Sequence, residues 1–299
     1  MLDFVLGAAV VASIYGLLAV ALNLQAGSTG LLNFGLVGFF GIGAYATGIG
    51  SLHGVPWPVS ILIGMVLASL AGAAVGRLGR TLGAEYWAIA TLALAELLRL
   101  VALNADSVTR GPQGITSVKP FFTNLNGNAR DVAWLVLGLA VLSVCLLIAR
   151  RIDRTQYGRV LRLVREREEV AASLGHDVVG AKVRVMALSA PMAALSGSLY
   201  THYLAFIGPS QLEPFATFLV WTMVVVGGLG SFWGVIAGAV LLEFLYDATR
   251  FIDDVISIPA DNAGGLRILV VGVALLGFLY FRPGGLIPER LRRVDAHRP

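Results

Sequence analysis

The sequence predicts an all-α, polytopic integral membrane protein with about nine transmembrane helices, in a range of about eight to ten. Composition is the first reason: of 299 residues, 57% are hydrophobic and 13% are charged, and the mean hydropathy is +0.80. A soluble domain carries roughly 25% charged residues. The second reason is that apolar segments of roughly 20 residues, long enough to cross a bilayer, recur along the chain.

The first candidate span is 2–26, which lacks a basic leading segment and a clear cleavage site, so we expect a retained helix rather than a signal peptide. The later candidate spans are 31–52, 57–76, 85–103, 132–149, 183–206, 214–229, 232–247 and 266–281. Several of them are short or rich in glycine. The connections between them are polar and too short for a separate domain, so residues 1–299 are expected to form one transmembrane domain.

A charged loop at 150–182 sets the orientation in the membrane. It holds eight Lys or Arg and five Asp or Glu residues, and Lys and Arg favour the cytoplasmic side of a bilayer. With this loop inside, Arg77, Arg80 and the arginine-rich tail 282–299 also fall inside. We therefore expect an external N-terminus and a cytoplasmic C-terminus. The arginines are interleaved with acids beside membrane spans, which argues against nucleic-acid binding.

The stretch 27–48 holds seven glycines together with Ser28, Thr29 and Asn33. Irregular backbone at membrane depth is tolerated only where it is buried or lines a wet cavity. A broken helix beside a substrate path is one interpretation, and a tightly packed regular helix is the other, with equal weight. Elsewhere, glycines spaced by four residues predict close helix packing, and these are Gly72, Gly76, Gly230, Gly234 and Gly238.

Glu96 and Arg99 lie three residues apart in one span, so they can pair and lower the cost of burying either charge. This favours a structural role for Glu96 over a proton relay. A carrier that uses Glu96 and Glu243 remains an alternative of another class, as does a structural subunit without a pathway. Cys145 is the single cysteine and the four histidines are scattered, so we expect no metal site, no cofactor and no enzymatic activity.

Residues 158–174 have a rough apolar stripe and are expected to form one amphipathic helix with Gly175 as its C-cap. Such a helix could dock into a groove on a soluble partner or lie on anionic lipid, and the residues favour neither. The chain has no G-x-x-x-x-G-K-S/T motif, so any ATP-driven work requires another polypeptide.

Four stretches carry a resemblance to a known family. They are ALNLQAGSTGLLNFGLVGFFGIGAYATG (21–48), 86–115, 157–203 with YGRVLRLVREREEVAASLGHDVVGAK, and MVVVGGLGSFWGVIAGAVLL (223–242), followed by FRPGGLI (281–287). In this order they resemble the LivM-type permease subunits of branched-chain amino acid ABC importers. The resemblance implies an ABC-importer permease fold in the bacterial inner membrane, with ATP bound on partner subunits. The implied partners are a second, H-type permease, two cytosolic ATPase subunits and an external or periplasmic binding protein.

The resemblance also implies site residues. A coupling helix at about 165–175 would receive the ATPase stroke through Arg165, Glu166, Glu169, Ala171, Ala172 and Gly175. Candidates for the translocation path are Asn23, Asn33, Phe34, Tyr45, Thr91 and Glu96. The chain departs from the family at Arg110, where glycine is common, and at Pro191 and Ser196, where small apolar residues or glycine are more usual. Family substrates are branched-chain amino acids, with urea, short amides and aromatic acids as alternatives.

Overall fold

The computed structural model describes residues 2–79, 82–116, 118–123 and 125–248, and short stretches between 272 and 289. Within these residues the chain is helical, with one isolated antiparallel bridge between Ile115 and Ile207. This confirms the all-α class predicted from the sequence. The helices are α1 (Leu2–Thr29), α2 (Leu36–Leu52), α3 (Trp57–Leu78), α4 (Ala84–Asn104), α5 (Asp106–Thr109), α6 (Asn128–Arg154), α7 (Gln156–Glu166), α8 (Glu168–Ser173), α9 (Val178–Leu204), α10 (Pro214–Gly227) and α11 (Phe232–Ala248), with short 3₁₀ turns η1 (Gly111–Gln113) and η2 (Pro209–Leu212).

Five of the helices are long and apolar enough to cross a membrane, namely α1, α3, α4, α6 and α9. The predicted spans 31–52, 214–229 and 232–247 correspond to shorter helices of 17, 14 and 17 residues. The predicted span 266–281 lies for the most part outside the described residues. The total of nine spans therefore stays a prediction.

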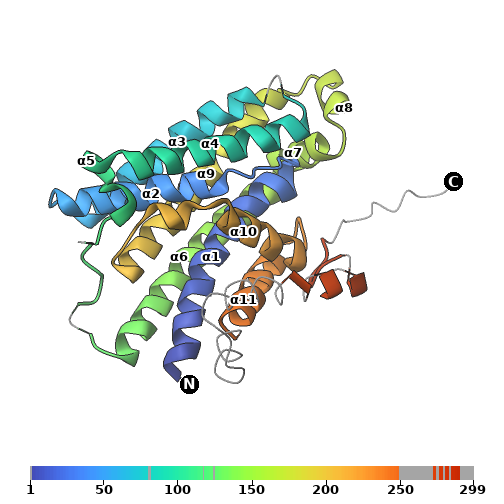
Figure 1. Cartoon of the computed structure of the whole chain (residues 1–299). Coiled ribbons are helices and arrows are strands. Elements are labelled where there is room, and N and C mark those ends of the chain that lie inside the picture. The colour runs from blue at the N-terminus through green and yellow to red at the C-terminus, as the bar shows by residue number, and fades with distance from the viewer. Residues whose placement is uncertain are drawn as a thin grey trace.

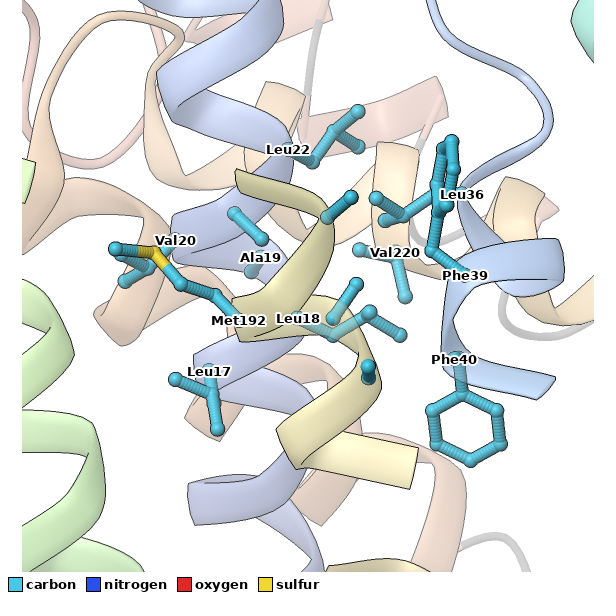
Figure 2. Close-up of a cluster of buried hydrophobic side chains, with 14 of the residues drawn as sticks. Leu17, Leu18, Ala19, Val20, Leu22, Leu36, Phe39, Phe40, Met192 and Val220 are labelled. Atoms are coloured by element: carbon cyan, nitrogen blue, oxygen red, sulfur yellow. The ribbon is translucent and has the colours of Figure 1, made fainter. Parts of the chain in front are cut away.

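Helix α1 lies at the centre of the bundle. It is apolar all round, which is typical of a helix surrounded by others, and it packs against α6, α9, α10 and α11 (Figure 1). Side chains such as Leu18 and Leu22 of α1 are almost fully buried. Figure 2 shows this part of α1 meeting Met192 of α9, Leu36 of α2 and Val220 of α10.

Glycines allow α3 and α9 to approach closely. A Cβ atom at Gly72 would lie 2.6 Å from the Met186 carbonyl oxygen, and one at Gly76 would lie 2.8 Å from the Val183 Cα. Gly234 and Gly238 face α10 in the same way, against the carbonyl oxygens of residues 227 and 223. Gly230, expected on the same helix face, instead lies in the turn between α10 and α11 with φ +85°. Its conformation, rather than helix packing, favours glycine there.

Pro191 interrupts the hydrogen bonding of α9 from inside the helix. Proline has no N–H, so the carbonyl four residues earlier loses its helical donor. That carbonyl belongs to Ala187, and it accepts a hydrogen bond of 2.9 Å from the Ser69 hydroxyl of α3. A side chain on the neighbouring helix therefore satisfies the group that the proline frees, as is usual for proline in membrane helices.

Replacement of Ser69 by alanine is expected to lower the free energy of unfolding by about 1 kcal/mol, because the Ala187 carbonyl then has no donor. In a Pro191→Ala background the backbone can supply the donor, so Ser69→Ala should have a smaller effect. Thermal unfolding of the four proteins in one detergent measures this coupling. An equal cost of Ser69→Ala in both backgrounds would contradict it.

Candidate functional site

The chain leaves the helical conformation between α1 and α2. Gly30 has φ +73° and residues 30–35 are not helical, before α2 begins at Leu36. The predicted span 31–52 is therefore broken near its start rather than regular. Its glycines are also closely packed, since a Cβ at Gly35 would clash with the Thr91 carbonyl and one at Gly43 with the Ala194 carbonyl. The stretch therefore combines a break with close packing, and its place beside a substrate path stays a prediction.

A buried polar network supports this break. The Asn33 amide nitrogen donates to the Gln25 side-chain oxygen at 2.8 Å, and the Gln25 amide nitrogen donates to the Ser189 hydroxyl at 2.7 Å. The Asn33 side-chain oxygen accepts from the Gly35 N–H at 2.7 Å. Gln25, Asn33 and Ser189 are all inaccessible to solvent. The network thus joins α1, the break and α9, and it pairs backbone that has no helical partner.

Two more side chains complete the support of the break. The Thr91 hydroxyl of α4 accepts from the Phe34 N–H at 3.1 Å, and the Trp221 indole N–H of α10 donates to the Asn33 carbonyl at 2.9 Å. The Phe34 ring also stacks on Trp221, with 5.1 Å between ring centroids. Asn33, Phe34 and Thr91 were candidates from the sequence, and the structure brings them together.

Sequence reasoning missed Gln25, Ser189 and Trp221. Gln25 and Ser189 are polar residues within apolar spans, which are expensive to bury and mark functional or structural sites. That signal was available for Gln25, two residues after the candidate Asn23. No sequence pattern relates Trp221 to residue 33, because the two meet only through the packing of α10.

The other path candidates lie apart from this network. The Asn23 side-chain oxygen accepts from the Gly230 N–H at 2.8 Å, so it supports the α10–α11 turn. The Asn23 amide nitrogen and the Tyr45 hydroxyl are buried and have no hydrogen-bond partner among the residues that the structure describes. Glu96 pairs with Arg99 of its own helix at 2.6 Å, and its side chain is 35% exposed. Glu243 lines a separate cavity of about 490 Å³, so Glu96 and Glu243 do not form one relay.

The loop 150–182 folds as two helices rather than one. The expected single helix 158–174 is interrupted at Arg167, where φ is −150°, which separates α7 from α8. Gly175 has φ +81° and its N–H donates to the Ala172 carbonyl at 3.0 Å, so it ends α8 as a glycine C-cap does. The buried Ala171 packs with Val164 and Val178 in a small core that belongs to the loop.

Several contacts fasten the loop to the membrane helices. Lys182 at the start of α9 forms an ion pair of 2.7 Å with Glu168 of α8. The Tyr157 hydroxyl of α7 donates to the Ala181 carbonyl at 3.2 Å, and burial raises the pKa of Tyr157. Glu166, Glu169 and Ala172 are exposed, unlike Ala171. The loop therefore forms a compact unit whose exposed residues include both acids and arginines.

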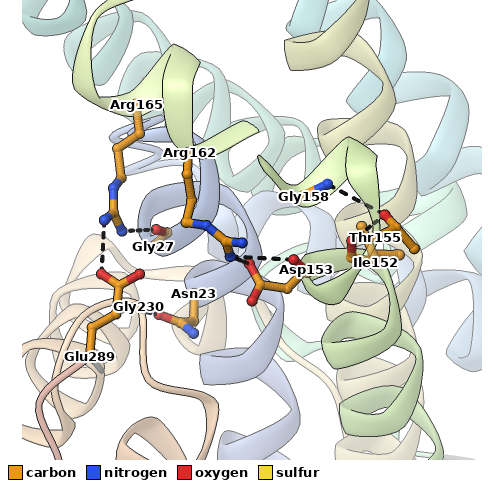
Figure 3. Close-up of polar contacts among 10 residues, drawn as sticks. All are labelled: Asn23, Gly27, Ile152, Asp153, Thr155, Gly158, Arg162, Arg165, Gly230 and Glu289. Atoms are coloured by element: carbon orange, nitrogen blue, oxygen red, sulfur yellow. Dashed lines mark hydrogen bonds and ion pairs between the residues drawn. The ribbon is translucent and has the colours of Figure 1, made fainter. Parts of the chain in front are cut away.

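Arg165 joins α7 to two distant segments. Its guanidinium donates to the Gly27 carbonyl near the end of α1 and forms an ion pair of 2.8 Å with Glu289. The Gly230 turn and Asn23 lie beside this pair (Figure 3). Charge-assisted hydrogen bonds of this kind are about twice as strong as neutral ones. Arg165 thus connects the loop to the helix that leads directly into the break at residues 30–35.

Arg110 is one of the departures from the family pattern. Its backbone lies in the left-handed region, with φ 60° and ψ 20°, a conformation that glycine adopts without steric cost. Ser196, another departure, has a hydrogen-bond partner, since its hydroxyl donates to the Ile14 carbonyl at 2.8 Å.

Among the described residues, no group of three or more His, Cys, Asp or Glu could hold a metal ion.

Comparison with known proteins identifies the family. The family described as the permease component of branched-chain amino acid transport systems matches residues 4–278. The high-affinity branched-chain amino acid transport system permease protein LivM of Escherichia coli is 28% identical, over 92% of this chain and 68% of that protein. The probable LivM of Methanocaldococcus jannaschii is 30% identical, over 93% of this chain and 91% of that protein.

A more distant relative is the ribose import permease protein RbsC of Haemophilus influenzae, 29% identical over 66% of this chain and 60% of that protein. No solved structure matches the chain. These relatives are transport permeases rather than enzymes, and the apolar helices agree with a multi-pass membrane protein. The chain belongs to the family of permease components of branched-chain amino acid transport systems.

Proposed function

We propose that this chain is the transmembrane permease subunit of an ATP-driven importer that carries branched-chain amino acids. Family membership along residues 4–278 is the single observation that carries the proposal. The chain has no G-x-x-x-x-G-K-S/T motif, so separate ATPase subunits bind and hydrolyse ATP. A second, H-type permease completes the pathway and an external binding protein delivers the substrate. Residues 1–299 act as one permease domain.

The basic end of the bundle faces the cytoplasm. The loop helices α7 and α8 lie at one end of the bundle (Figure 1), together with Arg77 at the end of α3 and Arg151 near the end of α6. Lys and Arg favour the cytoplasmic side, which places the loop 150–182 and the tail 282–299 inside. Because the end of α1 contacts the loop, its N-terminus lies outside.

Helix α8 and its flanking residues form the surface that contacts an ATPase subunit and moves with it when ATP is bound and hydrolysed. Val170 and Leu174 are exposed by 38% and 65%, and the acids Glu166 and Glu169 are exposed beside them. Exposed apolar side chains with a charged rim are typical of a helix that docks on another protein. Ala171, on the inner side, and the Gly175 cap hold α8 in shape.

The break at residues 30–35 lies on the translocation path and changes conformation during transport. Discontinuous membrane helices commonly form substrate sites, because their unpaired backbone can serve a ligand. Asn33, Phe34 and Thr91 lie at this break, whereas Asn23 and Tyr45 contribute to the path from α1 and α2. The internal pairing of Glu96 with Arg99 supports a structural role for that carboxylate, so no ion-coupled relay is required.

Charge reversal on α8 tests the docking surface. Glu169→Lys is expected to lower ATP-dependent uptake about fivefold, because it places a repulsive or unpaired charge in the interface. The matched control is Glu85→Lys, which reverses an exposed acid in the first turn of α4, outside the loop. Uptake is compared at equal membrane levels of each variant. Normal uptake by Glu169→Lys would remove α8 from the interface with the ATPase.

Uptake in cells with and without the gene tests the substrate. Deletion should abolish ATP-dependent uptake of radiolabelled leucine, and ATP depletion of the intact strain should do the same. Parallel arms with urea, a short amide and an aromatic acid distinguish the other substrates of this family. Unchanged leucine uptake with loss of another substrate would overturn the branched-chain assignment but keep the permease.

A further inference from the structure

A basic groove of about 1240 Å³ opens at the loop end of the bundle. It lies between the end of α6, helix α7, the α10–α11 turn and residues 287–289. Its charged lining consists of four arginines and three acids: Arg150, Arg154, Arg159, Arg162, Asp153, Glu166 and Glu289. Among these residues, only Glu166 has a role in the function proposed above, at the edge of the α8 docking surface.

The groove has an excess of positive charge. Arg162 forms an ion pair of 2.7 Å with Asp153 (Figure 3). Glu289 is paired with Arg165, which is not part of the lining. Among the lining residues that the structure describes, the three remaining arginines, Arg150, Arg154 and Arg159, are therefore balanced by Glu166 alone, which leaves an excess of two positive charges. An anion with one or two negative charges would complement this groove.

One wall of the groove has side chains that are typical of the membrane–water interface. The Arg150 guanidinium lies over the Trp233 ring at 5.1 Å from its centroid, and Trp233 is 55% exposed. Tryptophan is enriched at the membrane–water interface. One turn before Arg150, Leu147 is 64% exposed, and two turns after Trp233, Val240 is 42% exposed. The basic mouth therefore continues into exposed apolar surface on α6 and α11.

We propose that this groove binds the headgroup of an anionic phospholipid, with the acyl chains along α6 and α11. Basic pockets between membrane helices on the cytoplasmic side are suited to such headgroups, and this inference rests on the membrane orientation proposed above. A free phosphate would match the charge but leave the apolar surfaces of Trp233, Leu147 and Val240 without a partner. The bound lipid touches both α7 and the α10–α11 turn, next to the Arg165 contacts.

Lipid titration followed by native mass spectrometry tests the proposal on the purified full chain. Phosphatidylglycerol should bind at least about tenfold more tightly than phosphatidylcholine with the same acyl chains. The double variant Arg154→Gln/Arg159→Gln should lose affinity for phosphatidylglycerol by on the order of tenfold. The matched control Arg151→Gln/Arg167→Gln removes two exposed arginines of the same end that do not line the groove, and it should change affinity by less than about twofold.

A second measurement places the lipid. Brominated phosphatidylglycerol should quench tryptophan fluorescence in the wild-type chain more than in Trp233→Phe, because Trp233 lies in the groove. Millimolar inorganic phosphate should compete poorly. Equal loss in the two double variants, or equal binding of the two lipids, would overturn the proposal, and full competition by phosphate would reassign the groove to a free anion. None of these measurements depends on transport, so a failure here is distinct from a failure of the permease function.

Discussion

Replacement of Arg165 by glutamine is expected to reduce ATP-dependent substrate uptake more than tenfold while the protein remains in the membrane at its normal level. Arg165 contacts the Gly27 carbonyl of α1 and the Glu289 carboxylate. Hydrogen bonds to charged groups contribute about 1.5–3 kcal/mol each, so their loss weakens the connection between α7 and α1. A movement of the loop would then no longer reach the break at residues 30–35.

The control for Arg165→Gln is Arg151→Gln, in the same loop but outside α7 and α8. Arg151 is exposed, so its replacement removes the same charge without breaking the contacts to α1. A double-mutant cycle with Glu289→Gln separates the ion pair from the bond to Gly27. Equal uptake by Arg165→Gln and Arg151→Gln would show that the connection does not carry the movement of the loop to α1.

Replacement of Asn33 by leucine is expected to lower both stability and transport. The change leaves the Gln25 side-chain oxygen and the Gly35 N–H without their partner. Each buried unsatisfied group costs about 1–3 kcal/mol, so the free energy of unfolding should fall by about 2–6 kcal/mol. Uptake should fall on the order of tenfold, because the backbone at 30–35 is no longer held in one conformation.

The control for Asn33→Leu is Asn104→Leu at the exposed end of α4. Within the described part of the chain, the Asn104 amide donates to the Leu100 carbonyl of its own helix alone, at 2.7 Å, so its loss should change stability by less than about 1 kcal/mol. Thermal unfolding in detergent and uptake at matched expression measure both effects. If Asn33→Leu unfolds and transports like Asn104→Leu, the network does not support the break.

Much of this fold could be predicted because each long helix carries a local signal. An apolar run of about 20 residues identifies itself without reference to the rest of the chain, as for α1, α3, α4, α6 and α9. The role of Gly175 could also be predicted from a local signal, because a glycine at the end of an amphipathic stripe is typical of a helix C-cap. The break before α2 was anticipated as one of two interpretations, because seven glycines within 27–48 argue against a regular lipid-facing helix.

What could not be predicted depends on partners that are distant in sequence. Arg167 interrupts the loop helix, and beyond this interruption the buried Ala171 of α8 packs with Val164 and Val178. The side chain of Asn33 donates a hydrogen bond to Gln25 of α1. The backbone carbonyl of Asn33 accepts one from Trp221, which requires α10 to pack beside the break. Gly230 has helical spacing from Gly234 but lies in a turn, because spacing alone does not record backbone conformation.

The central claim is that this chain moves a branched-chain amino acid with energy from ATP hydrolysed on other subunits. The most direct measurement is uptake of radiolabelled leucine into proteoliposomes that contain this chain with its copurified permease and ATPase partners, in the presence of the cognate binding protein. Uptake should require ATP and should disappear when this chain is omitted or carries Arg165→Gln. ATP-independent uptake by this chain alone would contradict the claim.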